Sequence, residues 1–447
     1  MPNEISPIKL KIRNLLLKLK QSSFLKNILI VMSGTAIAQV IAYALSPIIS
    51  RLFTPEDFGV FGSFTAVAGI IGALITLDYS QALMLPKKNS EAINLFCLSL
   101  ISTVLISLLA AVICLLKPSI FFSLTKTRGI WFLFLFILTL TTTGINSGFQ
   151  AWAVRSKEFK RTSASQVIRS IGSSSLRIMF GIFKSGSSGL IISNLLANAM
   201  ASLNLIKVVT SDLKLLKNDL SLTRIKSLAK EYIDFPLYSA SQNFINAISS
   251  GLPVLLITKF YGLSAAGAYA FGISILHAPM SLVLTALRQV LFQKACEFQH
   301  EGRGIFLLYI RTVLVLFAIA IIPALILIIW SPPIFTFIFG ARWHLAGVLA
   351  RYLMIWMLFV FCNLPAVIFA RIIRAQRFVF FYDLIVLAIR TATLLLGGMY
   401  LNLTHTVMAF SIIGAFLNLF LISFVGKLVF KKEENVDKIS LRSILSQ

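Results

Sequence analysis

Apolar residues occur along this chain in long runs that short polar segments separate. Each run has about 20 residues, the length at which an α-helix crosses a hydrocarbon core of about 30 Å. We count twelve such runs in the sequence. They predict membrane-spanning helices near residues 27–50, 58–78, 92–116, 130–154, 163–183, 188–209, 236–258, 265–288, 305–330, 345–370, 378–400 and 406–430.

The fifth run, near residues 163–183, is the most polar, with two arginines and several serines in QVIRSIGSSSLRIMFGIF. Removing it would reverse the side of every later loop, so the distribution of Lys and Arg tests it. With the N-terminus inside, the inner segments hold 29 Lys and Arg residues and the outer turns hold 7. This positive-inside bias retains the fifth span and predicts that both termini are cytoplasmic.

Two stretches about 200 residues apart have a similar layout. They are QVIAYALSPIISRLFTPEDFGVFGSF (39–64) and EYIDFPLYSASQNFINAISSGLPVLLITKFYGLSAAGAYAFG (231–272). In both, a segment long enough to span the membrane has a proline in its later part. The next segment then begins with an aromatic Gly-Val-Phe or Gly-Ala-Tyr sequence. The second stretch is expected to break at Pro236, Pro253 and Gly262. Such an echo predicts a duplicated transporter with two matching halves.

The chain therefore divides into five predicted parts. They are a basic amphipathic N-terminal segment (1–26), a six-helix bundle (27–209), a cytoplasmic linker (210–235), a second six-helix bundle (236–430) and a cytoplasmic tail (431–447). The first part can lie on an anionic membrane surface, and it serves equally well as the positive flank that orients the first span. The predicted fold class is an all-α polytopic membrane protein with about 12 transmembrane helices in two bundles.

The composition agrees with this fold class and limits the function. The chain is 57% hydrophobic and 13% charged, with a mean hydropathy of +0.88, whereas a soluble domain is about a quarter charged. The net charge of +25 follows the inner loops, and no basic soluble domain exists to bind nucleic acid. The first 26 residues lack the uninterrupted apolar core of a cleavable signal peptide.

The sequence has no recognisable catalytic or metal-binding motif. Its four cysteines lack C-x-x-C or metal-ligand spacing, and its four histidines are scattered. There is no P-loop and no nucleophile elbow. We therefore expect no enzyme activity, no metal and no cofactor.

The segment Thr54-Pro55-Glu56-Asp57 has the pattern of a helix start. Thr54 is the expected N-cap, Pro55 the first helical residue, and Asp57 reaches back to complete a capping box. The two acids could instead form a functional carboxylate pair, and the cap is the favoured interpretation.

Several charged residues lie inside predicted spans, where a charge costs several kcal/mol unless it faces water or a partner. Arg169 and Arg177 share one face of the fifth span, and Arg351 lies about two turns into the tenth. Asp383 and Arg390 are seven residues apart in the eleventh span. Since internal acids are too few to pair these arginines, we expect a cavity that receives an anion. Asp383 could pair with Arg390, which is favoured, or could carry a proton.

Neutral polar residues also recur on single helix faces. The residues that we single out are Gln39, Asn146, Gln150, Asn194, Asn198, Asn243 and Asn246. Hydrogen bonds between helices explain any one of them, and this interpretation is favoured for each residue taken singly. Taken together, such stripes would suit a ligand rich in hydroxyl groups.

The chain resembles the Wzx-type O-antigen or capsule repeat-unit flippases, in the polysaccharide-transporter branch of the multidrug/oligosaccharidyl-lipid/polysaccharide exporter superfamily. The resemblance rests on LSPIISRLFTPEDFGVFGSF with LDYSQALMLPKK, on the 231–295 stretch, and on IFTFIFGARWHLAGVLARYL with its FG-x-x-W-x-x-AG step. It covers nearly the whole chain, and it depends on the motifs occurring in this order. At the place where the family usually has an acid in a Tyr-Glu-like step, this chain reads Asp78-Tyr79-Ser80-Gln81, so no functional acid is carried over.

The resemblance implies two six-helix bundles in a V shape, as in the multidrug exporters of the superfamily, that work by alternating access. It implies an undecaprenyl-diphosphate-linked oligosaccharide as substrate in a bacterial inner membrane. Membrane lipids, a polysaccharide polymerase and a chain-length regulator are the expected partners. The diphosphate would then dock on the four arginines while the sugars meet the Asn and Gln stripes.

Three rival functions follow from similar span counts or from the same fold. A polysaccharide polymerase or ligase would need a large outer loop, and the longest here has only about a dozen residues. A multidrug exporter of cations would favour an acidic cavity. A lipid II flippase would bring about two more spans.

Overall fold

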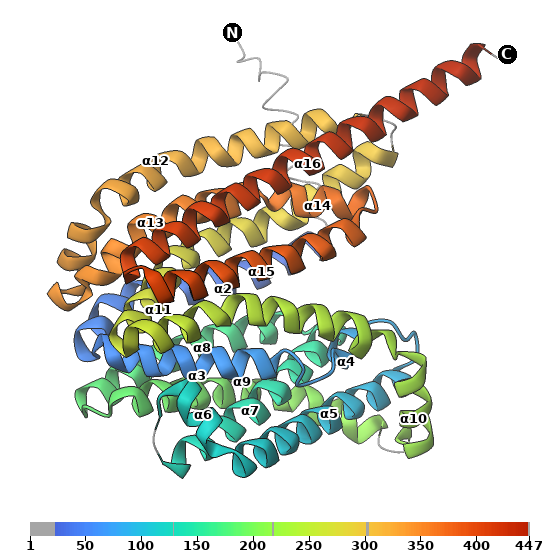
Figure 1. The fold of residues 1–447 in the computed structure, drawn as a ribbon. Coiled ribbons are helices and arrows are strands. Elements are labelled where there is room, and N and C mark those ends of the chain that lie inside the picture. The colour runs from blue at the N-terminus through green and yellow to red at the C-terminus, as the bar shows by residue number, and fades with distance from the viewer. Residues whose placement is uncertain (1–22, 128, 217–218, 301–303, 446–447) are drawn as a thin grey trace, which may run out of the picture.

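The computed structural model describes residues 23–127, 129–216, 219–300 and 304–445, and nearly all of them are helical (Figure 1). No β-strand occurs in those ranges, so the predicted all-α fold class is confirmed. The predicted N-terminal segment, residues 1–26, lies mostly outside the described residues.

The helices of the N-terminal half follow the predicted spans with short additions. They are α2 (Ser23–Leu52), α3 (Pro55–Gly72), α4 (Tyr79–Ala82), α5 (Asn89–Leu116), α6 (Pro118–Thr125), α7 (Ile130–Arg155), α8 (Phe159–Ile182) and α9 (Gly186–Leu216). The predicted linker contains one more helix, α10 (Leu222–Glu231). The capping box at the start of α3 is confirmed, because Asp57 N donates to Thr54 Oγ1 at 3.2 Å and Thr54 N donates to Asp57 Oδ2 at 3.0 Å.

The C-terminal half begins with a π-helical turn. Its elements are η2 (Phe235–Ala240), α11 (Ser241–His300), α12 (Phe306–Phe339), η3 (Ala341–Trp343), α13 (His344–Cys362), α14 (Leu364–Ile372), α15 (Gln376–Tyr400) and α16 (Leu403–Leu445). Each of the twelve predicted spans thus falls on a helix in the described part of the chain.

Helix breaks differ from two of the sequence predictions. The predicted break at Pro253 is wrong, because α11 continues through it and kinks only at Gly262, with φ +87°. Membrane helices tolerate proline where neighbouring helices satisfy the freed backbone groups. The tenth span was expected to be continuous, but it divides at Asn363 into α13 and α14, where Pro365 lies in the first turn of α14.

Eight stretches of the described chain are apolar and long enough to cross a membrane, and one of them, Phe235–Gln299, contains two of the predicted spans. The polar fifth span, α8, is not among them, yet it forms a regular helix packed between α2 and α9. Its arginines and serines together explain the low hydropathy. Ser165 Oγ donates to Ala201 O at 3.0 Å, and Ser170 Oγ donates to Ala38 O. Small polar residues of this kind let helices approach closely.

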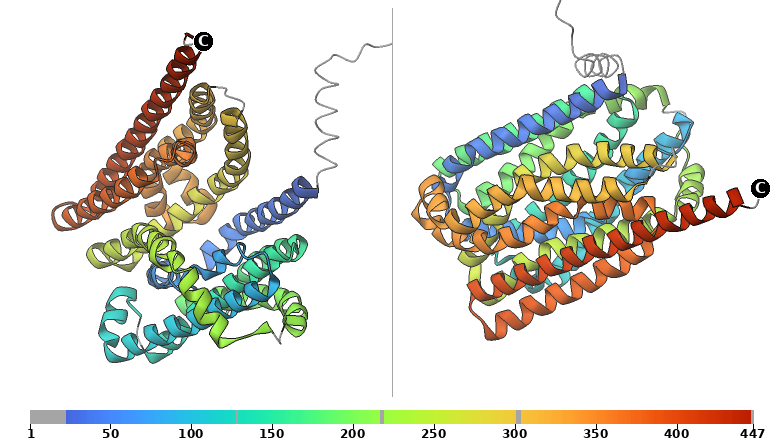
Figure 2. Two further views of the ribbon diagram at one scale, coloured as in Figure 1. Left: turned by 90° about the vertical axis from the view of Figure 1, so that its right-hand side faces the viewer. Right: turned by 90° about the horizontal axis from the view of Figure 1, so that it is seen from above.

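The helices form two groups, one from each half of the chain, which Figure 2 shows side by side (blue to green, and yellow to red). All of them run roughly between two ends of the molecule. The turn end holds residues 52–55, 259–264 and 339–344, at the left of Figure 1. The linker end, at the right, holds α10, the end of α14 and the C-terminal part of α16.

At the turn end the two halves touch through backbone at two glycines. A Cβ at Gly267 of α11 would lie 1.7 Å from the carbonyl oxygen of Pro55. A Cβ at Gly59 of α3 would lie 2.0 Å from the carbonyl oxygen of Leu263. Since no side chain fits at either position, α3 and α11 pack backbone against backbone here. Both glycines belong to the repeated stretches of the sequence.

An aromatic cluster surrounds this glycine contact. The ring of Phe58 lies edge-on to Phe271 and to Trp343, with centroids 5.3 and 5.1 Å away. Trp343 is fully buried, and its Nε1 donates to the carbonyl oxygen of Ser50 in α2 at 2.7 Å. Further along, the hydroxyls of Ser63 and Thr258 are hydrogen-bonded at 2.7 Å. The two halves are therefore joined at the turn end by packing and neutral hydrogen bonds.

We expect Gly59→Ala to destabilise the protein by about 1–3 kcal/mol, the usual cost of inserting a methyl group into a packed site. The new Cβ would collide with the carbonyl group of Leu263. Because this group belongs to the backbone, it cannot move aside as a flexible side chain would. The apparent melting temperature in detergent measures this effect.

The matched control is Gly69→Ala, in the same helix, where a new Cβ would have no atom within 4 Å. There the better helix propensity of alanine should leave stability unchanged or slightly raised. Equal melting temperatures for the two variants would show that the glycine contact is not a determinant of stability.

Candidate functional site

A cavity of ≈ 730 Å³ lies within the C-terminal half. Helices α11, α13, α14, α15 and α16 form its walls. Its polar lining consists of Gln242, Asn246, Ser249, Asn363, Arg371, Arg377, Tyr382, Asp383, Arg390 and Asn418. Three of the residues predicted from the sequence, Asn246, Asp383 and Arg390, thus line one space.

Arg390 is held in this cavity between two aromatic rings. Its Cζ atom lies 4.3 Å from the ring centroid of Trp356 and 4.4 Å from that of Phe410. Guanidinium groups stack favourably on aromatic faces, and Trp offers the strongest attraction. Its Nε atom is buried without a hydrogen-bond partner among the described residues. The rings fix the position of the cation in the cavity lining, and no other described residue accepts a hydrogen bond from its guanidinium.

Asp383 lines the same cavity but does not form the favoured ion pair with Arg390. Two ion pairs within 4.0 Å join side chains that the structure describes, Arg161–Glu158 and Arg224–Glu91, and neither contains Asp383 or Arg390. The two side chains start on the same face of α15, and the aromatic rings hold the guanidinium of Arg390 instead. Asp383 therefore leaves the charge of Arg390 unneutralised, and proton uptake by Asp383 stays a prediction.

The break between α13 and α14 places an amide pair on the cavity wall. Asn363 lies at that break, and its Nδ2 donates to Oδ1 of Asn418 on α16. Asn418 Nδ2 in turn donates to Gly414 O at 2.7 Å. These amides present hydrogen-bonding groups a short way from the charged residues of the same cavity.

A second polar network crosses the N-terminal half. Gln150 Nε2 donates to Asn146 Oδ1 at 2.7 Å, and Asn146 Nδ2 donates to Ser202 Oγ on α9 at 2.9 Å. Gln166 of α8 links this pair to a predicted cation. Its Nε2 donates to Gln150 Oε1 at 3.3 Å, and its Oε1 accepts from Arg169 Nη2 at 2.8 Å. Asn146, Gln150 and Arg169 are thus brought together.

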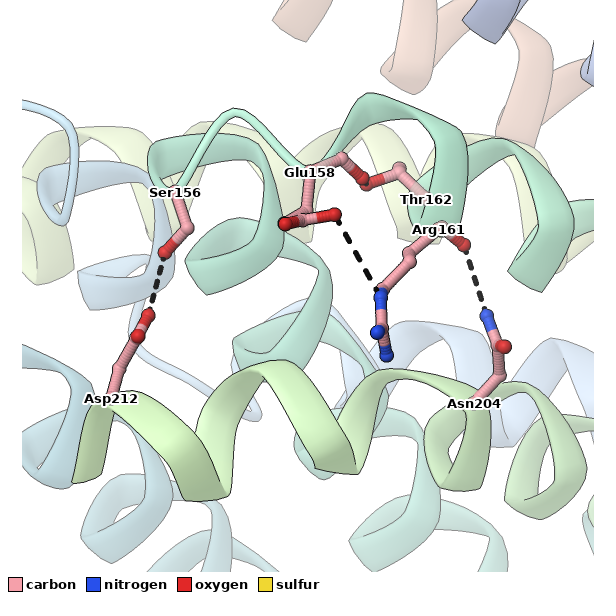
Figure 3. Close-up of polar contacts among 6 residues, drawn as sticks. All are labelled: Ser156, Glu158, Arg161, Thr162, Asn204 and Asp212. Carbon is pink, nitrogen blue, oxygen red and sulfur yellow. Dashed lines mark hydrogen bonds and ion pairs between the residues drawn. The ribbon is translucent and has the colours of Figure 1, made fainter. Parts of the chain in front are cut away.

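Further polar contacts connect α7, α8 and α9 (Figure 3). Asp212 of α9 accepts a hydrogen bond from Ser156 Oγ at 3.0 Å, and Arg161 pairs with Glu158 at 3.7 Å. Asn204 Nδ2 donates to the carbonyl oxygen of Arg161 at 3.0 Å. The side chain of Arg161 thus pairs within its own helix, while Ser156, Asp212 and Asn204 provide the hydrogen bonds between helices.

The remaining predicted residues lie outside the larger cavity. Arg177 is half-buried, with its Cζ 5.2 Å from the ring centroid of Phe61 on α3. Gln39 Oε1 accepts from Ser281 Oγ at 3.3 Å, and Asn243 Nδ2 donates to Asp78 Oδ2 at 3.2 Å, so both bridge the two halves. Asn198 accepts through its backbone from Ser202 Oγ, and Asn194 lies one turn earlier on α9. A substrate role for these residues stays a prediction.

Arg351 faces helix α12 and is not part of the lining of the larger cavity. Its Nη2 donates to the carbonyl oxygen of Ile329 at 3.0 Å. In a regular helix that carbonyl would accept from the backbone N–H four residues later, which here belongs to Pro333 and is missing. The contact supplies the hydrogen bond that the proline removes.

Several lining residues were missed at the sequence level. Arg371 and Arg377 were counted as topology charges only, although three arginines within RIIRAQR were a visible cluster. Trp356 and Phe410 gave no signal, because an aromatic residue in an apolar run is indistinguishable from a lipid-facing one. Their function depends on two helices that meet only in the folded chain.

Comparisons with known proteins place this architecture in a class. The lipid II flippase MurJ in an inward closed conformation matches with a TM-score of 0.72 and 15% identity, over 93% of this chain and 92% of that one. An inward-facing multidrug resistance MATE transporter of the MOP superfamily matches with a TM-score of 0.65 and 14% identity, over 87% and 96%. These likenesses define the fold as that of the MOP superfamily transporters.

A third structure, a MOP superfamily transporter from Pyrococcus furiosus with a binding pocket of reversed polarity, matches with a TM-score of 0.57 and 14% identity, over 90% and 96%. A search of the curated proteins finds no match. Residues 48–347 match the family described as "Polysaccharide biosynthesis protein". The match covers more than half of the chain, so the protein belongs to this family, which confirms the resemblance seen in the sequence at that level.

We expect Arg351→Gln to lower stability by about 1–3 kcal/mol, because it leaves the Ile329 carbonyl without a hydrogen bond in a membrane helix, where water does not replace the lost donor. In a Pro333→Ala background the Ile329 carbonyl regains its helical donor, so the same substitution should cost clearly less. Apparent melting temperatures of the four proteins in this double-mutant cycle measure the coupling.

A different result would support the predicted role of Arg351 in substrate binding. That result is full stability of Arg351→Gln together with loss of transport, whichever residue occupies position 333.

Proposed function

We propose that the protein is a flippase that moves an oligosaccharide linked to undecaprenyl diphosphate across a bacterial inner membrane by alternating access. The observation that carries this proposal is the ≈ 730 Å³ cavity with Arg390 stacked between Trp356 and Phe410. The guanidinium donors suit a diphosphate, and the amides of Asn246, Gln242 and the Asn363–Asn418 pair suit sugar hydroxyls.

The charge of the cavity favours an anionic cargo. Its lining contains three arginines and one aspartate, and none of the three arginines forms an ion pair within the described residues. A carrier of organic cations would be served better by the opposite balance of charge. Membership of a polysaccharide biosynthesis family supports a glycan as the attached group.

Positive-inside topology assigns the linker end to the cytoplasm, together with both termini. The larger cavity reaches that end through Arg371 and Arg377, whereas the turn end is sealed by the glycine and aromatic contacts. The described conformation would then receive a substrate from the cytoplasmic side. Transport would require the contacts at the turn end to separate as the halves rock.

The pathway follows from the same chemistry. A glycan carried on a lipid diphosphate is the precursor of O-antigen, capsule or a related polysaccharide. A polysaccharide polymerase and a chain-length regulator are the partners that would use the product on the outer side. The protein would need no nucleic acid and no cofactor for this role.

We expect Arg390→Ala to reduce transport at least about tenfold, since a charge-assisted hydrogen bond to phosphate contributes about 1.5–3 kcal/mol. Arg390→Lys keeps the charge but loses the planar stack on both rings, so its transport should also fall. Flipping of a fluorescent undecaprenyl-diphosphate oligosaccharide in proteoliposomes measures both variants.

Arg311→Gln is the control, because Arg311 is exposed on α12 and is not part of the lining of the larger cavity. Surface-glycan complementation in a strain that lacks its own flippase should follow the same order. Normal glycan with Arg390→Ala at equal protein levels would refute the anion-binding role.

A further inference from the structure

A smaller cavity near the linker end contains a second pair of arginines. It has a volume of ≈ 230 Å³ and is lined by Arg288, Phe292, Val367, Ile368 and Arg371. Arg288 and Phe292 come from the last part of α11, and the other three come from α14. The lining contains no acidic residue.

Helix α14 separates this cavity from the larger one. Val367 and Arg371 line both spaces, so the side chain of Arg371 is common to them. Arg371 occupies the last turn of α14, where the helix dipole favours a cation. An anion bound at the smaller cavity could pass to the larger one without leaving this guanidinium.

Charge at the linker end does not by itself explain the pair. Arg374 lies three residues after Arg371, is also exposed, and serves the positive-inside bias as well, yet it lines neither cavity. Arg288 and Arg371 come from different helices and share one space. Neither forms an ion pair within 4.0 Å among the described residues.

The surroundings indicate what kind of anion would bind. Phe292, one turn after Arg288 on the same face of α11, lines the cavity and is 46% exposed. A cationic cavity beside an exposed aromatic ring suits the phosphate of a lipid, with the lipid chain against Phe292 and the headgroup on the arginines. The volume is about a third of that of the larger cavity, so it matches a phosphate group better than an oligosaccharide.

We propose that Arg288 and Arg371 form an entry site for a phosphate ester carried on a lipid, from which Arg371 passes the phosphate to Arg377 and Arg390. This inference rests on the proposed function for the second step only. The phosphate at the entry site could belong to the diphosphate substrate or to an anionic phospholipid, since both present the same group to the arginines.

Four single variants separate the two cavities. Arg288→Gln changes only the smaller cavity, Arg377→Gln changes only the larger one, and Arg371→Gln changes both. Arg374→Gln removes the same charge from the same loop and changes neither. All four side chains are exposed, so equal melting temperatures are expected and serve as the test of folding.

The full-length protein in phosphatidylcholine nanodiscs is titrated with undecaprenyl diphosphate, and in a second arm with phosphatidylglycerol. Native mass spectrometry counts the molecules bound. Arg288→Gln and Arg371→Gln should weaken the entry site about tenfold, and Arg374→Gln should not. In a double-mutant cycle, Arg288 should couple to Arg371 and be additive with Arg377.

The two arms identify the source of the phosphate. A response of both lipids to Arg288→Gln supports a general headgroup site, and a response of undecaprenyl diphosphate alone supports a site for the substrate itself. Binding unchanged in Arg288→Gln, or weakened as much in Arg374→Gln, would overturn the proposal. If Arg288→Gln leaves binding unchanged while Arg390→Ala still abolishes binding in the larger cavity, the entry site is refuted and the proposed function stays intact. If Arg288→Gln weakens binding while Arg390→Ala has no effect, the entry site is supported and the proposed function is refuted.

Discussion

The close approach of α3 and α11 is the constraint on which the rest of the structure depends. Gly59 and Gly267 lack side chains, so the carbonyls of Leu263 and Pro55 lie directly against the facing helix. In a membrane, where the lipid tails are as apolar as leucine, such packing and the short contacts it permits are what hold helices together. Helix α11 also contributes walls to both arginine-bearing cavities. The position of both cavities relative to the N-terminal half therefore follows from this contact.

The groups that join the halves at the turn end are neutral. They are aromatic rings, the indole N–H of Trp343, and the hydroxyls of Ser63 and Thr258. Separating neutral hydrogen bonds costs about 0.5–1.5 kcal/mol each once water replaces the partner, whereas breaking a buried ion pair strands a charge at a cost of several kcal/mol. Neutral contacts of this kind stabilise one conformation and still allow the two halves to separate at the turn end. This property is what a carrier that alternates between two sides requires.

The positions of the spans could be predicted from the sequence because the bilayer imposes a fixed apolar length on every helix. The capping box at Thr54 and the kink at Gly262 could also be predicted, since both depend on neighbouring residues alone. The continuous α11 at Pro253 and the break before Pro365 could not, because neighbouring helices decide whether a proline is tolerated. The same limit applied to the arginines. Helical spacing placed each on a face, but the neighbour of that face is set by tertiary packing.

A charged side chain in a membrane-spanning segment is costly, and the four predicted arginines are each stabilised in a different way. Arg169 is bound by the amide of Gln166, Arg351 compensates for a proline, and Arg177 lies on a single ring. Arg390 alone among these four has two aromatic faces and a cavity in front of it, and its side chain forms no hydrogen bond with another described residue. A cation stabilised on its faces but not at its donors gains most from an anion that approaches in the plane of the guanidinium. Arg169 and Arg351 already use donors on the protein, so a ligand would have to displace those contacts. Arg177 also has a buried Nε atom without a hydrogen-bond partner, but it is not part of the lining of the larger cavity. The combination of unpaired donors with a cavity in front of them therefore singles out Arg390 among these four arginines.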